Sequence, residues 1–174
     1  MSNKTKRNKI LIIILIIITL TAIGITIWAL FFREPAKPVI QDYAPQQVES
    51  NAQSIENDDD TSKLEQPVGG DSVSLTYTKE VTLSLSGKQA SLTFQNPAKS
   101  NQDMVLQLII DEKAIATSGR LPAGYKLDKL SNVDTAKLSA GTYEGKFRVL
   151  YYDTDTGEKA MINTEIPITI TVTE

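Results

Sequence analysis

The sequence predicts an all-β protein: an antiparallel β-sandwich of about seven strands, preceded by one transmembrane helix and a disordered linker. Three observations predict this fold class: an uncharged run at 10–32, a polar and acidic stretch at 33–71, and short alternating apolar runs from 72 onward. We therefore divide the 174 residues into a basic cytoplasmic tail (1–9), a signal anchor (10–32), a linker (33–71) and an extracytoplasmic domain (72–174).

The run at 10–32 contains no charged residue and is dominated by Ile and Leu. A helix of that length is ~35 Å long, enough to cross a hydrocarbon core of ~30 Å. Four basic residues precede it (Lys4, Lys6, Arg7 and Lys9), and the positive-inside rule then places the N-terminus in the cytoplasm. A cleaved signal peptide is the alternative, but its apolar region is usually only about 7–15 residues. We expect a single-pass protein of the cell membrane that contacts the bilayer through 10–32.

The linker at 33–71 is rich in Pro, Gln, Ser, Asn and Asp and has few large apolar side chains. Burial of so few apolar groups does not offset the entropy lost on ordering, so we expect a disordered, acidic tether. The run Asp58–Asp60 resembles a calcium ligand set, but consecutive carboxylates without a shaped loop are more typical of a solvated spacer.

Apolar residues alternate with polar ones over several short segments of the C-terminal region, and this period of two is typical of strands with one buried face. Residues Met104–Ile110 are continuously apolar except for Gln107, which predicts a central strand covered on both faces. Pro167 lies inside the last alternating run and cannot donate a ladder hydrogen bond, so we expect an edge position or a bulge there. The clearest alternating sets are Val81/Leu83/Leu85, Ala90/Leu92/Phe94, Tyr143/Phe147/Val149/Tyr151 and Ile166/Ile168/Ile170/Val172.

One motif is more specific than the alternation. Leu138, Gly141 and Tyr143 have the L-x-x-G-x-Y spacing of a tyrosine corner, in which a tyrosine hydroxyl caps upstream backbone before the penultimate strand of a sandwich. On this motif the region resembles immunoglobulin-like and fibronectin-III-like domains, without their Cys pair and core Trp.

The same region resembles small single-pass envelope proteins of Gram-positive bacteria over residues 73–173. The matching stretches are 94–97, 106–111, 118–124 and 138–143, with the sequences FQNP, LQLIID, SGRLPAG and LSAGTY. The resemblance implies an extracytoplasmic sandwich domain in the cell envelope and implies no catalytic activity.

The chain contains no Cys and no His, which excludes disulfides, thiolate or imidazole metal ligands and the common Cys-His and Ser-His-Asp catalytic sets. No phosphate-binding glycine motif occurs, and a net charge of −3 gives no basic excess for nucleic acid. The residues 153–158 begin like a calcium loop, but the Gly and Glu of an EF-hand are not at the required positions, which favours a hairpin turn. We expect no enzyme, no metal site, no cofactor and no nucleic-acid partner.

A candidate interaction surface remains on the strand near 143–153 and the turn after it. Lys146 and Arg148 lie on its outward face, and we add Tyr152, Asp153 and Asp155 as neighbouring polar groups. A solvated sheet face is the simpler interpretation of these residues.

Taken together, the sequence favours a membrane-anchored extracytoplasmic protein-interaction or structural module of the bacterial cell envelope. Such a module would bind envelope proteins as an accessory to a surface, secretion or conjugative apparatus. The alternative is a module that binds cell-wall carbohydrate or peptidoglycan, for which exposed aromatic side chains are needed. The candidates are Tyr77, Tyr125, Tyr151 and Tyr152.

Overall fold

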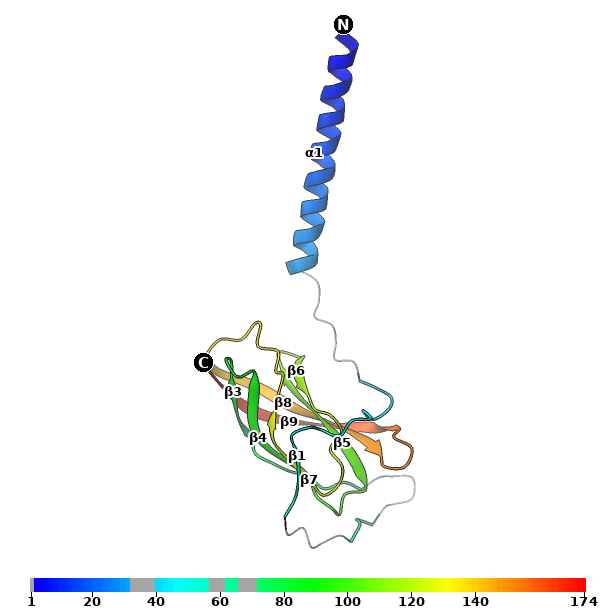
Figure 1. Ribbon diagram of the computed structural model, residues 1–174, viewed down its shortest axis with the longest axis vertical. Helices are drawn as coiled ribbons and strands as arrows, with labels where there is room; N and C mark the ends of the chain where they lie inside the picture. Colours follow the sequence, from blue (N-terminus) through cyan, green and yellow to red (C-terminus); the bar gives the residue numbers. More distant parts are fainter. Residues whose placement is uncertain (1, 32–39, 57–61, 66–71) are drawn as a thin grey trace. The chain divides into compact units, whose positions relative to one another are not determined.

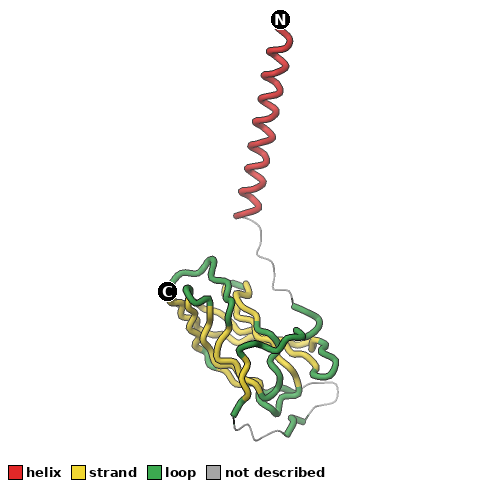
Figure 2. The backbone as a smooth tube through the Cα atoms, in the orientation of Figure 1, coloured by secondary structure: helices red, strands yellow, loops and turns green. Residues whose placement is uncertain are grey.

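A computed structural model describes residues 2–31, 40–56, 62–65 and 72–174. The chain forms two compact units, Met1–Ala36 and Lys37–Glu174. The first consists of one helix and the second of strands and loops, as the colouring of Figure 2 shows.

The helix of the first unit, α1, spans Ser2–Phe31 (Figure 1). Over the described residues, no helix has the length and apolar character needed to cross a membrane. This finding contradicts the predicted transmembrane anchor at 10–32 and the single-pass membrane location inferred from it. It also leaves the expected bilayer contact without support.

The described residues of the second unit form nine strands in one sheet, with the order β1-β7-β4-β3-β9-β8-β5-β6 and with β2 paired to β4 (Figure 1). The strands are β1 (Ala52–Ser54), β2 (Thr76–Tyr77), β3 (Glu80–Ser84), β4 (Gln89–Asn96), β5 (Gln102–Ile110), β6 (Lys113–Thr117), β7 (Tyr125–Leu130), β8 (Gly141–Asp153) and β9 (Lys159–Thr173). All pairs are antiparallel except β3 and β9, which run parallel from Glu80 opposite Thr169 to Ser84 opposite Thr173.

The predicted antiparallel sandwich of about seven strands is therefore wrong, although the β content is confirmed. The parallel pair of β3 and β9 joins two antiparallel halves into one mixed sheet that curls into a half-barrel. Alternation along the sequence shows that a segment is a strand, but it does not show which strand lies beside it.

The concave face of the sheet holds the main hydrophobic core. Phe94 of β4 and Phe147 of β8 meet edge to face there, with ring centroids 6.2 Å apart. Every residue of β5 is buried, as predicted for a strand covered on both faces, although β5 is the next-to-last strand of the sheet. On the outer face of the sheet, Val105, Leu150 and Tyr152 form a second, smaller cluster, and Ala44 packs against it.

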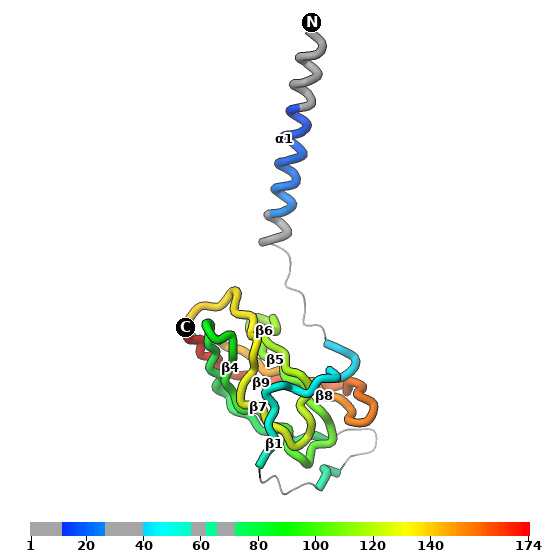
Figure 3. Tube along the Cα trace, in the orientation of Figure 1, coloured from blue at the N-terminus to red at the C-terminus, as the bar shows by residue number. Residues whose placement is uncertain are grey.

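Residues 40–56, called here the docked segment, lie against this sheet and end in β1 beside β7 (Figure 3). Tyr43 forms a bridge with Glu158, and Val48 forms one with Arg120. Residues 62–65 are also attached, since the N–H of Leu64 donates to the carbonyl of Lys99 at 3.0 Å. The prediction of a disordered linker is thus wrong for 40–56 and 62–65. The Asp58–Asp60 run lies outside the described residues.

Candidate protein-interaction surfaces

The two predicted basic residues, Lys146 and Arg148 of β8, are paired with carboxylates of the same unit. The Nζ of Lys146 lies 2.9 Å from Glu112 and 2.9 Å from Glu165, and Arg148 contacts Glu165 at 2.7 Å. The hydrogen bond with Glu112, and then that with Glu165, raises the pKa of Lys146. The bond from Lys146, and then that from Arg148, lowers the pKa of Glu165. The surface is therefore largely neutralised within the sheet.

Glu112 reaches this network because of the turn between β5 and β6. Asp111 and Glu112 form a two-residue turn with positive φ angles of 48° and 58°, the backbone of a type I′ hairpin. The turn borders an open depression of about 570 Å³ that is also lined by Lys146, Glu165 and Pro167. Sequence reasoning missed Glu112 and Glu165 as partners, since only the strand register places them beside the basic residues.

Tyr152 does not join Lys146 and Arg148 on an open surface, although all three lie on the same face of β8. It is buried under the docked segment, and its hydroxyl donates to the carbonyl of Gln41 at 3.2 Å. Burial, and then the negative charge of Asp42, raises the pKa of Tyr152. Tyr151 is buried as well, so two of the four tyrosines named for carbohydrate binding are not exposed.

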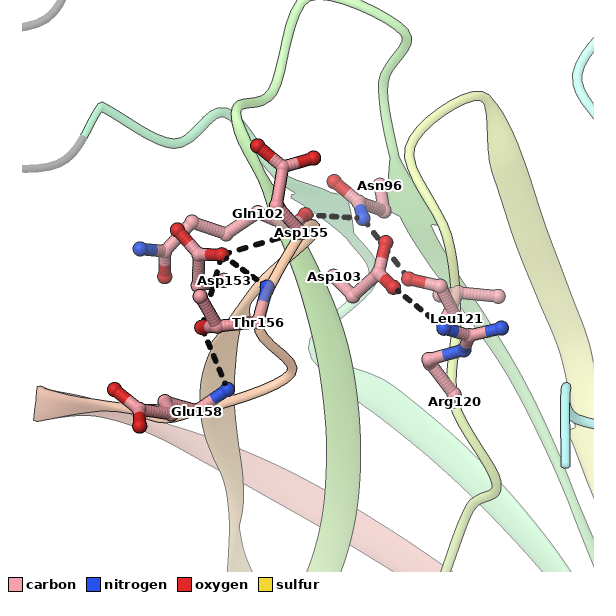
Figure 4. A network of polar contacts seen from close by, with 9 residues as sticks. All are labelled: Asn96, Gln102, Asp103, Arg120, Leu121, Asp153, Asp155, Thr156 and Glu158. Atoms are coloured by element: carbon pink, nitrogen blue, oxygen red, sulfur yellow. Dashed lines mark hydrogen bonds and ion pairs between the residues drawn. The ribbon is translucent and has the colours of Figure 1, made fainter. Parts of the chain in front are cut away.

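Asp153 is the last residue of β8, and Asp155 lies in the turn between β8 and β9 (Figure 4). The Oδ1 of Asp153 accepts from the N–H of Asp155 at 2.9 Å, and from the N–H of Thr156 at 2.7 Å. The bond from Thr156, and then that from Asp155, lowers the pKa of Asp153. The carboxylate thus caps its own turn. Within the described part of the chain, no three acidic side chains gather as metal ligands.

A buried polar cluster lies beside that turn and connects β4, β5 and the segment after β6 (Figure 4). The Nδ2 of Asn96 donates to the carbonyls of Gln102 at 2.9 Å and Leu121 at 3.0 Å. Asp103 lies 3.4 Å from Arg120. Burial raises the pKa of Asp103, and the charge of Arg120 opposes this shift. These contacts hold the chain between β6 and β7 against the sheet.

The residues of the predicted tyrosine corner lie together at the start of β8. The hydroxyl of Tyr143 accepts from the N–H of Ser139 at 3.1 Å and donates to the carbonyl of the same residue at 3.1 Å. Leu138 and Tyr143 are half-buried against the main core, and Gly141 is the first residue of β8. The structure therefore brings the three motif residues into one turn.

The sequence analysis did not identify one further candidate surface. It is the edge of β9 on the side that faces away from β8. At one end of that edge, the docked segment covers Glu158 and Lys159, since the N–H of Lys159 donates to the carbonyl of Asp42 at 2.9 Å. At the other end, β3 begins to pair at Thr169. Between them, at 160–168, no backbone hydrogen bond on this side joins β9 to any other described residue. We call 160–168 the open edge.

The direction of the backbone groups on the open edge follows from the neighbouring contacts. The N–H of Thr169 points away from β8, because it donates to the carbonyl of Lys79 at 2.9 Å. Pairing of β9 with β8 is regular from Val172 back to Asn163, and successive residues direct their N–H groups to opposite sides. Asn163 and Glu165 therefore present their N–H and C=O groups outward. Pro167 shares this orientation, which confirms the expected edge position.

Two apolar side chains on the open edge are in contact with solvent. Met161 is 99% exposed and Ile162 is 74% exposed. These are the highest values among the large apolar residues described in the second unit. An unpaired strand edge with exposed apolar side chains is a template for strand addition. The sequence signal was the short apolar run at 160–162, directly after a polar turn.

Comparison with known proteins gives only weak likenesses. No family model matches the chain, and no curated protein gives a significant match. Among solved structures, the YadV chaperone has 16% identity and a TM-score of 0.36, over 56% of this chain and 50% of that one. The Escherichia coli chaperone DraB has 17% identity and a TM-score of 0.38, over 59% of this chain and 55% of that one.

A third similar structure is AggA, the major subunit of aggregative adherence fimbriae type I from Escherichia coli. It has 15% identity and a TM-score of 0.33, over 63% of this chain and 100% of AggA. The chain thus spans about half the length of the two chaperones. Because all three TM-scores lie below 0.5, we base no functional argument on these likenesses.

Proposed function

We propose that this protein is a non-enzymatic protein-interaction module that accepts a β-strand from its partner at the open edge of β9. The observation that carries the proposal is the open edge itself: outward N–H and C=O groups at Asn163 and Glu165, beside the exposed Met161 and Ile162. A strand added there would satisfy the backbone groups and cover the apolar side chains.

The other surfaces support this choice. Lys146 and Arg148 already have carboxylate partners, and Tyr152 is covered by the docked segment. The absence of Cys and His from the sequence favours a binding role over a catalytic one. The finer setting, as an accessory to a bacterial surface, secretion or conjugative apparatus, belongs to the proposal and rests on the sequence resemblance alone.

Site-specific photo-crosslinking of the full chain in its native cells tests this function. A photoreactive residue replaces Met161 in one strain and Ser91, an exposed residue of β4, in the control strain. We expect a discrete adduct at 161 and none at 91. The adduct should disappear when Ile162→Lys or Asn163→Pro is added, because the first places a charge at the edge and the second removes an outward N–H.

Circular dichroism of each variant shows whether the sheet is retained. Because the N–H of Asn163 points away from β8, the proline costs no hydrogen bond to that strand. Equal adducts at 161 and 91, or an adduct at 161 that persists in both folded edge variants, would refute the proposal.

A further inference from the structure

We infer that the strand received at the open edge is β9 of a second copy of this chain, which pairs antiparallel about a two-fold axis at Thr164. This inference rests on the proposed function and names the partner of the same site. An antiparallel pairing of one strand with itself is isologous, so each copy presents the same residues and the assembly closes as a dimer.

The backbone of the open edge fits this register. With Thr164 opposite Thr164 of the second copy, Asn163 lies opposite Glu165 of that copy, and Glu165 lies opposite its Asn163. Both residues direct their N–H and C=O groups outward. The two copies therefore exchange two reciprocal pairs of backbone hydrogen bonds, as an antiparallel ladder requires.

The side chains fit the same register. Ile162 lies opposite Ile166 of the second copy, and Met161 lies opposite its Pro167. Pro167 is exposed, whereas Ile166 is only 6% exposed, so the main apolar contact in this register is that of Met161 with Pro167. Asn163 lies opposite Glu165 of the second copy. The carboxylate of Glu165 already accepts from Lys146 and Arg148, but it has further lone pairs that can accept from the side-chain amide of Asn163.

The docked segment and β3 limit the alternatives. A register centred on Ile162 would place Glu165 of the second copy opposite Lys159, where the carbonyl of Asp42 already accepts the N–H at 2.9 Å. A register centred beyond Ile166 would reach Thr169, whose N–H is bonded to Lys79. The open edge between these contacts, 160–168, has its centre at Thr164.

The absence of Cys from the chain allows a direct test with introduced thiols. The two Thr164 residues form a non-hydrogen-bonded pair, in which Cα atoms lie ~4.5 Å apart, within the range that a disulfide spans. Full-length Thr164→Cys is oxidised mildly at low micromolar concentration beside a Ser91→Cys control. Because pairing presents the thiols at ~mM effective concentration, we expect Thr164→Cys to crosslink at least about tenfold faster. Association through α1 is common to both variants and does not produce this difference.

A second reporter avoids changing Thr164, whose hydroxyl accepts a hydrogen bond from Tyr151. A Met161→Cys chain is mixed with a Pro167→Cys chain, and we expect the mixed disulfide to form faster than that of either chain mixed with Ser91→Cys. Addition of Ile162→Lys should slow both reporters to the rate of the control.

The outcomes distinguish a failure of self-pairing from a failure of the proposed function. Equal crosslinking of the edge reporters and the Ser91→Cys control would overturn self-pairing. If the photo-adduct at 161 then has a mass other than twice the 19.1 kDa of this chain, the open edge binds a different protein and the proposed function stands. If no adduct forms at 161, both fail.

Discussion

The carboxylate of Glu49 accepts a hydrogen bond from the backbone N–H of Gly119 at 2.7 Å, across 70 positions of sequence. Its other oxygen accepts from the N–H of Asn51 at 3.0 Å. Glu49 lies in the docked segment, and Gly119 lies in the chain between β6 and β7. One carboxylate therefore fastens the docked segment to the sheet. The same docked segment covers one end of the open edge of β9.

Replacement of Gly119 by alanine should release the docked segment near Glu49. A Cβ at Gly119 would lie 2.9 Å from both the Cα and the N of Glu49, and 3.0 Å from the carbonyl oxygen of Gln47. The atoms it meets are backbone, so the segment must move, and we expect a cost of about 1–3 kcal/mol. Hydrogen exchange at the Glu49 and Ala52 amides should then become faster.

Gly87→Ala is the matched control for this change. The atoms nearest to a Cβ at Gly87 all belong to side chains, with the Oγ of Ser84 closest at 3.2 Å, so a small side-chain shift accommodates the methyl group. Unchanged protection at Glu49 in Gly119→Ala, or an equal loss in Gly87→Ala, would show that close backbone approach does not hold the segment.

Acid should weaken the same attachment. Burial alone would raise the pKa of Glu49, but the hydrogen bonds from Gly119, Asn51 and Ser50 outweigh it, so the pKa lies below its ordinary value of 4.5. A lowered folded-state pKa gives stability that is fully present above pH 4.5 and is lost as the pH falls through the folded value. The protection factors of the docked segment, which are corrected for the pH dependence of intrinsic exchange, should therefore fall as the pH drops below 4.5.

The Glu49→Gln variant separates the effect of protonating Glu49 from the effects of protonating other carboxylates. Glu165 and Asp153 also have lowered pKa values, so the whole sheet loses stability in acid. We expect the difference in segment protection between the native chain and Glu49→Gln to be largest at neutral pH and to shrink in acid. A difference that is constant with pH would contradict the role of the ionised carboxylate.

The sequence predicted individual strands well because a buried face leaves a mark at every second residue. Val81 and Leu83 of β3, and Ile168 and Ile170 of β9, are all buried as expected. The parallel contact between these two strands was not predictable, because both sides of a strand carry the same backbone groups and the side-chain pattern does not indicate its neighbour. Because of this parallel pair, the strands form one mixed sheet and not the expected sandwich.

The docked segment shows why the composition of 33–71 led to a wrong prediction of disorder for residues 40–56. Its polar residues predict disorder when burial of apolar groups is the only driving force. Tyr43 and Val48 instead attach through backbone bridges, which depend little on side-chain polarity. Lys146 and Arg148 lie on the outer face of β8, but only 23% and 15% of their side chains are exposed. Glu165 is their partner because of the register of β8 and β9, which the sequence does not show.

Tyr152→Phe should loosen the start of the docked segment. The lost hydroxyl donates to the carbonyl of Gln41, and we expect a local loss of about 0.5–1.5 kcal/mol while the ring keeps its packing against Val105 and Leu150. Proteolysis near Gln41 should become faster. An unchanged cleavage rate, with the chain still folded, would show that the hydroxyl does not hold the segment.

The same hydroxyl should make the attachment sensitive to alkali. Burial, and then Asp42, raises the pKa of Tyr152 above 10.0. A raised folded-state pKa gives stability that is fully present below pH 10.0 and is lost as the pH rises through the folded value. In Tyr152→Phe this alkaline loss of segment protection should be smaller than in the native chain.

Tyr143→Phe should destabilise the second unit by about 0.5–1 kcal/mol, because the hydroxyl both accepts from and donates to the backbone of Ser139. Part of that turn is exposed, and water replaces some of the lost bonding, so we expect the lower half of the range for a single hydrogen bond. The midpoint of urea denaturation measures the change. Tyr125→Phe is the control, since that hydroxyl makes no hydrogen bond within the described part of the chain. Equal midpoints for the two variants would mean that the bond pair in the turn before β8 contributes nothing to the stability of the sheet.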